Sequence, residues 1–424
     1  MSFVSTQRER DKAVILNVVR NFGPVSQVEI HRLTHLRTST ISQLTKELLQ
    51  EGHLQVSGRS DNPTGRKQVL LRVNEEQGFL LGIEFDSDTV VAGVMDLVPK
   101  IRALVKEPTR RDGGVEGLVQ QLIDCGKKAL AEAGVPLRRL RGIGLADVGL
   151  VNRRTGMTIV SSQLDFWRDV PLARRFEEAF DAPALLDNAT RCRGNAERLL
   201  GAGESAEDLI YIEYGAGIGS AIFSGGRVIE GHRTSAGEFG HTRVTPGGPA
   251  CKCGSFGCLE AVAGSPALAN RFREIIREGG SSLALSLVPG GDPAAVTGWD
   301  VLKASRAGDK VCLLIVEEMA RHLATGIGNL VNLLDPARIV LDQRLEVCGP
   351  DFLEQLRRAI RLQALTHLTD DLVICYGSLG EEAGVLGAGL LSLEELFAIP
   401  ELKPPRFLVE PQEAVSSRKS SCAT

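Results

Sequence analysis

Four side chains that favour metal binding lie close together in the middle of the chain. His241, Cys251, Cys253 and Cys258 place three thiols and one imidazole within eighteen positions, and the glycines between them permit tight turns. Such a set fills a tetrahedral zinc site and leaves no position open for water, which is typical of a structural site. The sequence therefore predicts a structural Zn²⁺ bound by these four residues. The alternative is a loop with three reduced cysteines and no metal.

A second group of polar side chains lies near the N-terminus, on a segment with helical periodicity. Ile41, Leu44 and Leu48 recur at the spacing of one helix face, so we expect them to be buried together. The opposite face would carry short polar side chains: Thr38, Ser39, Thr40, Ser42, Gln43 and Lys46. Side chains of these types can reach base edges or phosphates from a helix in the major groove.

The elements expected around this segment predict a winged helix-turn-helix. Apolar periodicity and turn residues predict three helices and two short strands, over residues 8–22, 26–33, 38–50, 53–56 and 68–73. The polar loop between the strands carries Arg59, Arg66 and Lys67. Basic side chains in a wing can contact a phosphate or enter a minor groove. We therefore expect residues 1–76 to bind a double-stranded DNA operator; the alternative is a packing module with an incidental polar face.

Charge is unevenly distributed along the 424 residues and supports a nucleic-acid contact confined to this head. The chain carries a net charge of −4, but residues 1–74 carry +5 and the remainder carries −9. No apolar run reaches the roughly 18 residues of a membrane span, and the N-terminus lacks the apolar core of a signal peptide. We therefore expect a cytoplasmic protein without membrane contact, in which the nine cysteines are free thiols or metal ligands.

From Gly78 onward, strand-like runs alternate with helical stretches, as in an α/β domain with two lobes. This alternation of strands and helices predicts one large domain over residues 77–398. The last segment, residues 399–424, lacks periodicity and is predicted to be a disordered tail.

Two motifs in this domain resemble the ROK family of repressors and sugar kinases. One is GIGLADVGLVNRRTG at residues 142–156, and the other is the Glu-x-x-His…Cys-x-Cys-x4-Cys-Leu-Glu pattern from Glu238 to Glu260. The resemblance covers about residues 10–395. It implies an actin-like (ribonuclease H-like) sugar-kinase fold with a sugar bound between two lobes. For a repressor of this family it also implies a homodimer or homotetramer, because one winged helix contacts only half a site.

The resemblance also implies which residues would bind the sugar-type effector. Carried onto this chain, they are Asn188, Glu238, His241, Glu260 and Gly149. A polyol needs a convergent set of hydrogen-bond donors and acceptors, which these side chains can supply. His241 would bind zinc through one ring nitrogen and leave the other for a hydroxyl. Two positions differ from the family pattern, because Val148 replaces a proline and Gln163 stands where asparagine is common.

Phosphoryl transfer to a sugar requires a base and a cradle for ATP phosphates, and both are altered here. The base expected after Asn188 is replaced by Ala189, whose methyl group cannot accept a proton. The family's glycine-rich phosphate loop is replaced by the stretch Glu84–Asp88, which introduces carboxylates that would oppose phosphate. Near the expected adenosine site, Asp342-Gln343 replaces two glycines. The sequence therefore predicts that the protein is not an enzyme.

Three hypotheses follow for the function of the chain. The first is a transcriptional regulator that responds to a sugar or sugar derivative. The second is a DNA-binding protein that needs no ligand and keeps a vestigial sugar pocket. The third is a sugar kinase with an added winged helix, which Ala189 argues against.

Overall fold

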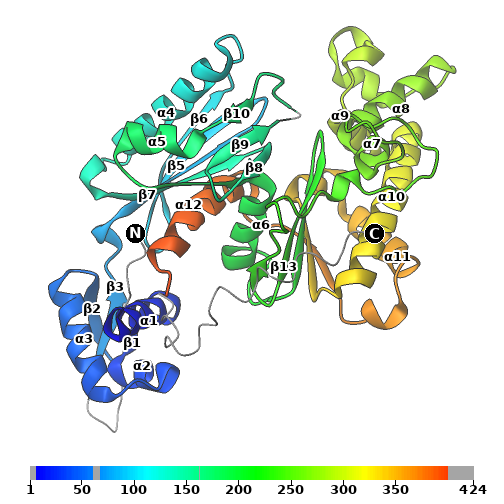
Figure 1. Ribbon diagram of the computed structural model, residues 1–424. Coiled ribbons are helices and arrows are strands. Elements are labelled where there is room, and N and C mark those ends of the chain that lie inside the picture. The colour runs from blue at the N-terminus through cyan, green and yellow to red at the C-terminus, as the bar shows by residue number, and fades with distance from the viewer. Residues whose placement is uncertain (1–5, 61–66, 162, 400–424) are drawn as a thin grey trace, which may run out of the picture. The chain divides into compact units, whose positions relative to one another are not determined.

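The computed structural model describes residues 6–60, 67–161 and 163–399, and it divides into two compact units (Figure 1). One unit comprises Met1–Gln77 with Glu394–Thr424, and the other comprises Gly78–Leu393. Within the described ranges, none of the helices combines the length and apolar character needed to span a membrane.

The first unit packs three helices against a small antiparallel sheet with the strand order β1–β3–β2. Its elements are α1 (Gln7–Phe22), β1 (Val25–Ser26), α2 (Gln27–Thr34), α3 (Thr38–Gln50), β2 (Leu54–Arg59) and β3 (Val69–Val73). Apolar side chains from the helices and the sheet fill its centre, among them Ile15, Ile30, Ile41, Leu48 and Leu71. The order of elements is the one expected from the sequence, and the helix bounds agree closely with those predicted from periodicity.

Local sequence fixes the ends of these helices and hence the angle at which α3 follows α2. Ser26 caps α2 in a capping box with Glu29, so two backbone N–H groups at the helix start gain partners. The helix ends at His35, whose φ of 56° lies in the left-handed region that favours glycine. Beside this turn, Nδ1 of His31 lies 2.7 Å from the carbonyl oxygen of Leu36.

The chain returns to this first unit after Leu393. Phe397 follows helix α12 (Ala383–Leu396), and its carbonyl oxygen accepts a hydrogen bond from Asn17 of α1 at 2.6 Å. The guanidinium of Arg20 lies 4.8 Å from the centre of the Phe397 ring. The tail predicted to be disordered lies outside the described residues beyond Ile399.

The first lobe of the second unit is a five-stranded sheet with the order β11–β7–β4–β5–β6. Its strands are β4 (Phe79–Phe85), β5 (Thr89–Asp96), β6 (Ile101–Pro108), β7 (Leu140–Asp147) and β11 (Ala184–Asn188). One face packs on α4 (Gly114–Glu132) and α5 (Leu172–Phe180), and α12 lies on the other (Figure 1). A Cβ at Gly82 would lie 2.2 Å from the carbonyl oxygen of Val385, so only glycine lets α12 approach this closely.

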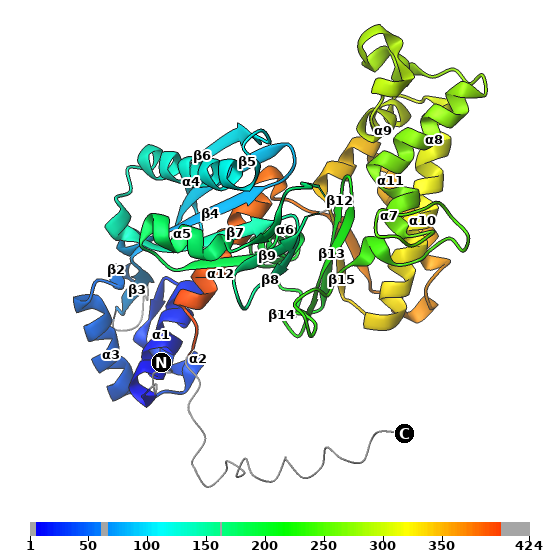
Figure 2. The same ribbon diagram turned by 45° about the horizontal axis from the view of Figure 1, so that its top comes forward.

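The second lobe is a five-stranded sheet with the order β14–β13–β12–β15–β16. Its strands are β12 (Leu209–Tyr214), β13 (Ile218–Ser224), β14 (Arg227–Val228), β15 (Arg338–Leu341) and β16 (Val373–Tyr376). Four helices cover one face of it (Figure 2): α8 (Ser265–Arg277), α9 (Gly298–Arg306), α10 (Lys310–Leu334) and α11 (Pro350–Arg361).

Helix α6 (Ala189–Leu200) lies between the two lobes and contacts both. A Cβ at Gly194 would meet Ala221 of the second sheet at 2.6 Å, and a Cβ at Gly387 of α12 would meet the carbonyl oxygen of Cys192 at 1.8 Å. Side chains on both sides of α6 can therefore reach the inner faces of the two sheets.

Candidate functional site

The four predicted metal ligands converge in the second unit. His241 ends a short 3-10 helix, η3 (Phe239–His241), and Cys258 precedes helix α7 (Leu259–Ala263), while Cys251 and Cys253 lie on the loop between them. All four ligand atoms lie within 4.8 Å of one another. Short backbone bridges, Arg243 to Cys258 and Ala250 to Phe256, bring the loop back on itself. The cluster can hold a tetrahedral metal ion, and its soft donors suit zinc.

The thiols of this cluster differ in acidity. Hydrogen bonds from the backbone N–H of Ser255 and from Cys251 lower the pKa of Cys253, whereas burial raises the pKa of Cys251 to about 12. Cys251 would therefore lose its proton only when a cation binds. The two nitrogens of His241 face different groups, because Nδ1 lies 3.6 Å from Cys251 Sγ and Nε2 lies 3.9 Å from a Glu238 oxygen. This arrangement suits metal binding through Nδ1.

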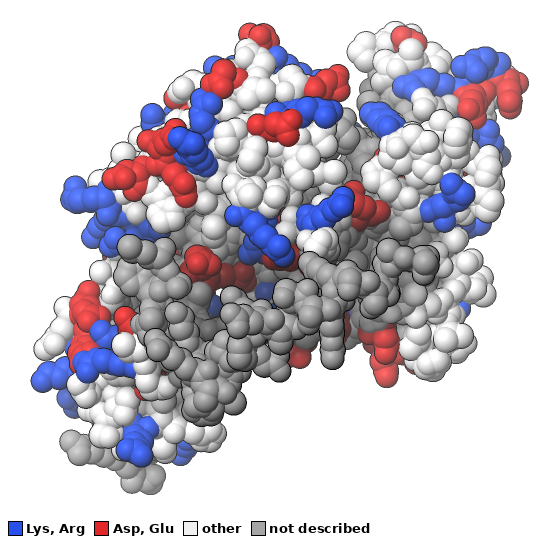
Figure 3. All heavy atoms as spheres, viewed as in Figure 1, with Lys and Arg blue, Asp and Glu red and all other residues white. Residues whose placement is uncertain are grey.

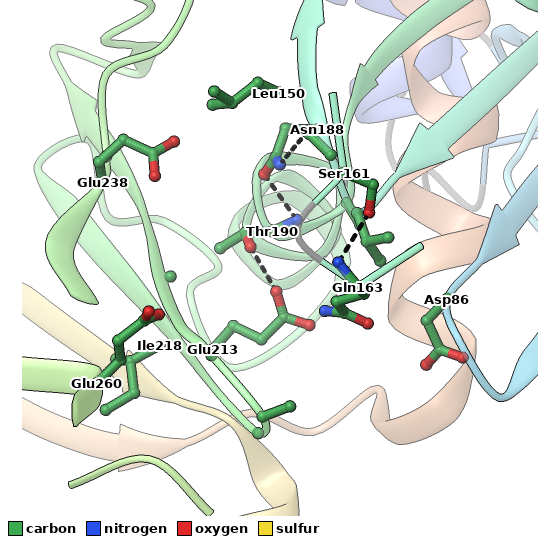
Figure 4. Close-up of a pocket in the computed structure, with 18 of the residues that line it drawn as sticks. Asp86, Leu150, Ser161, Gln163, Asn188, Thr190, Glu213, Ile218, Glu238 and Glu260 are labelled. Atoms are coloured by element: carbon green, nitrogen blue, oxygen red, sulfur yellow. Dashed lines mark hydrogen bonds between the residues drawn. The ribbon is translucent and has the colours of Figure 1, made fainter. Parts of the chain in front are cut away.

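A cavity of about 730 Å³ lies between the two lobes of the second unit, beside the cysteine cluster. It is lined by all five residues expected to bind the sugar, Asn188, Glu238, His241, Glu260 and Gly149, and also by Gln163. Figure 4 shows Glu238 and Glu260 on one side of the pocket and Asp86 on the other, with Asn188, Thr190 and Glu213 between them. Burial raises the pKa of Glu238, and repulsion from Glu260 adds to that rise, while His241 and Arg191 oppose it.

Asp147, which the sequence did not single out, positions the loop at Gly149. It is fully buried, and its carboxylate accepts hydrogen bonds from Gly149 N, Thr158 Oγ1 and Trp167 Nε1 at 2.7, 2.5 and 2.8 Å. Asn188 then donates to the Gly149 carbonyl oxygen at 3.1 Å and accepts from the Thr190 N–H at 3.0 Å. The Asn188 amide is therefore held in one orientation at the start of α6.

At the position expected for a catalytic base the structure has only the methyl group of Ala189, which lines the cavity. The preceding acid, Asp187, is buried and bonds to Arg191 Nε at 2.7 Å. The Asp187 side chain is directed away from the cavity, so it does not replace the missing base.

The altered phosphate loop separates into two parts in the structure. Asp86 and Asp88 line the cavity, and Asp86 accepts hydrogen bonds from the backbone N–H groups of Asp88 and Thr89, both at 2.7 Å. Glu84 does not line the cavity. Successive side chains of β4 point to opposite faces of the sheet, and that of Glu84 is directed toward α6. The two carboxylates that stand in place of the family's glycines, Asp86 and Asp88, therefore both line the cavity.

A buried charge network that sequence reasoning missed joins the two lobes through α6. Arg193 donates to both oxygens of Glu84 at 2.6 and 2.8 Å and lies 3.5 Å from Glu213 of β12. Thr190 also hydrogen-bonds Glu213, and Arg344 lies between Glu213 and Asp342. Asp342, which replaces a family glycine, is thus buried in an ion pair.

The predicted DNA-binding residues of α3 lie on one side of the helix in the first unit. Thr38, Ser39, Ser42, Gln43 and Lys46 are exposed and Thr40 is half-buried. Ile41, Leu44 and Leu48 are buried on the other side, with exposed fractions of 2% or less. Arg59 and Lys67 of the wing are exposed, and Arg66 lies outside the described residues.

Comparisons with known proteins agree with the resemblance drawn from the motifs. The sequence model of the ROK family matches residues 80–395. A xylose repressor of Caldicellulosiruptor bescii is 27% identical over 93% of this chain and 98% of its own length. A glucokinase of Halalkalibacterium halodurans is 31% identical over 73% of this chain and 94% of its own length.

One solved structure shares the architecture of most of the chain. A ROK family transcriptional regulator, described as a homologue of the MLC protein of Escherichia coli, matches with a TM-score of 0.80 and 21% identity, over 92% of this chain and 96% of the other. This likeness confirms the predicted α/β fold of the actin-like, sugar-kinase type.

Proposed function

We propose that this chain, which belongs to the ROK family, is a DNA-binding transcriptional regulator that responds to a sugar and has no kinase activity. The observation that carries the proposal is the exposed polar side of α3 in a winged helix-turn-helix, on a chain whose interlobe cavity has Ala189 where a kinase needs a base. The relative that is named a xylose repressor covers both units, whereas the glucokinase covers only the length of the second.

The first unit would bind a double-stranded operator through α3 in the major groove. Gln43 and the neighbouring hydroxyls would contact base edges, and Lys46, Arg66 and Lys67 would contact phosphates or the minor groove. Because one such unit covers only half a site, we expect a homodimer or homotetramer. Such a regulator would act in the cytoplasm.

The second unit would bind the effector. Asn188, Glu238, His241 and Glu260 would hydrogen-bond the hydroxyls, while the Gly149 loop closes the cavity beside them. Zn²⁺ bound by His241 and the three cysteines would be structural. It would fix the wall that carries Glu260, whose carboxylate lies 3.3 Å from Cys251 Sγ.

The second candidate function, sugar phosphorylation, is favoured only by the fold and by the glucokinase relative. Ala189 supplies no base, and Asp86 and Asp88 occupy the place of phosphate-binding glycines. A coupled assay of ATP consumption with a panel of hexoses and pentoses tests it, and turnover of any sugar would contradict the proposal.

The deciding experiment for regulation selects operator fragments from random DNA with the full-length protein. Gel-shift titration with the selected fragment and each sugar of the panel then follows. We expect one sugar to change the DNA affinity by at least about 10-fold, a coupling of about 1.4 kcal/mol. Specific DNA binding that no sugar alters would support the ligand-independent alternative instead.

A further inference from the structure

We infer that the effector is an unphosphorylated sugar, and that the cavity excludes sugar phosphates. The inference rests on the proposed sugar response and adds the chemical class of the ligand. Its basis is the charge of the cavity wall, where carboxylates outnumber the cationic groups: Asp86, Asp88, Glu213, Glu238 and Glu260 against Arg191 and Arg344.

Both lining arginines already form ion pairs with carboxylates. Arg191 pairs with Asp187, and its side chain is 6% exposed. Arg344 pairs with Asp342 and lies 3.6 Å from Glu213. Each guanidinium therefore already has a carboxylate partner outside the cavity lining, Asp187 or Asp342. The described part of the lining contains no lysine.

The charge network to which Glu213 and Arg344 of the wall belong does not supply excess positive charge either. In it three carboxylates, Glu84, Glu213 and Asp342, share two guanidinium groups, those of Arg193 and Arg344. One negative charge is left in excess within low-dielectric surroundings. If Zn²⁺ is bound by three thiolates and a neutral imidazole, the cysteine cluster adds a second excess negative charge.

The remaining carboxylates face the cavity from opposite sides. Glu238 and Glu260 lie on the side of the cysteine cluster, and Asp86 lies across the pocket (Figure 4). Asp88 has only a distant partner, Arg111 at 3.8 Å. These carboxylates on opposite walls would repel a phosphate group, whereas sugar hydroxyls can donate charge-assisted hydrogen bonds to them. The face of the second unit that is visible in Figure 3 lacks this bias, because basic and acidic side chains are interspersed over it.

Calorimetry with matched pairs of ligands tests the inference on the full-length protein. The probes are glucose and glucose 6-phosphate, N-acetylglucosamine and its 6-phosphate, and xylose and xylose 5-phosphate. We expect at least one free sugar to bind, and its phosphate to bind at least about 100-fold more weakly, as expected for two unit charges about 4 Å apart near a protein surface. Added salt should screen the repulsion and so reduce the difference in affinity between the free sugar and its phosphate. The affinity for the free sugar should stay constant.

Charge-neutralising variants make the test specific to the cavity. Asp86→Asn combined with Asp88→Asn should reduce the ratio of the free-sugar affinity to the sugar-phosphate affinity at least about 10-fold. Asp112→Asn, on the exposed surface outside the cavity, should leave this ratio unchanged. Tighter binding of a phosphate ester, or a ratio that the double variant does not alter, would overturn the inference while the sugar response stands. If neither member of any pair binds, the proposed sugar response fails as well.

Discussion

Arg193 of α6 binds both oxygens of Glu84 of β4, at 2.6 and 2.8 Å, in the interior between the two lobes. Glu84 is 5% exposed, and burial raises the pKa of its carboxyl, while Arg193 opposes the rise. Bidentate geometry of this kind compensates a buried charge, but neither member can be removed alone without cost.

Arg193→Ala should therefore destabilise the protein by about 3–5 kcal/mol, because it leaves the Glu84 carboxylate buried without a partner. Protonation relieves a group whose folded pKa is raised, so this loss should be smaller at pH 5 than at pH 8. Chemical denaturation at the two pH values measures both effects. The matched control, Arg193→Met with Glu84→Gln, should recover most of the stability. A single variant as stable as the parent would show that the pair contributes nothing.

Removal of the metal should destabilise the second unit. Cys253→Ser opens a closed four-ligand site, and the free energy of metal binding is part of the folding free energy. Elemental analysis should find one zinc per chain in the parent, and strong chelation should lower its melting temperature. Cys375→Ser, outside the cluster, is the control and should keep its zinc. A melting temperature unmoved by chelation, with no zinc found, would contradict the prediction.

Ala189→Asp should not create a kinase. The new carboxylate would restore a base beside Asn188, but Asp86, Asp88, Asp342 and Gln343 still stand where the family has phosphate- and adenosine-binding glycines. Coupled measurement of ATP consumption with the sugar panel should stay at background. Measurable phosphorylation by this single variant would mean that the nucleotide site is intact.

Gln43→Ala should relax the sequence preference of DNA binding. Its amide is exposed on α3 and has only a long contact, 3.3 Å, to Glu47. The loss of one base-edge contact should cost about 1–3 kcal/mol on the selected operator and little on other DNA. Lys67→Ala is the comparison, because loss of a phosphate contact should weaken all sequences together and reduce the salt dependence. Equal behaviour of the two variants in gel shifts would be inconsistent with base contact by Gln43.

Glu260→Ala should leave DNA binding of the ligand-free protein intact and abolish the response to sugar. A ligand shifts the equilibrium between two conformations only by its differential affinity for them, and this variant removes one hydrogen-bond acceptor of the cavity. Because Glu260 lies 3.3 Å from Cys251, zinc content must be measured alongside, and it should equal that of the parent. Release of DNA at the parental sugar concentration would show that this cavity is not the sensor.

The features that the sequence by itself determined are those carried by local spacing. The bounds of α3 and the Cys251–Cys258 cluster follow from residue types a few positions apart, and the missing base at Ala189 follows from the resemblance to the family motif. Periodicity and motif spacing describe a single element or loop, and for features of that size they predicted the structure correctly.

The tertiary structure alone decided how charge is arranged between the lobes. Glu84 and Arg193 are 109 positions apart, and they meet because α6 lies between two sheets whose alternating residues direct Glu84 and Glu213 inward. In the sequence, Glu84, Asp86 and Asp88 belong to one acidic stretch, in which two carboxylates replace family glycines. In the fold, Glu84 is neutralised in the interior, whereas Asp86 and Asp88 face the cavity. Strand alternation and burial, rather than residue type, determine which charges a ligand meets.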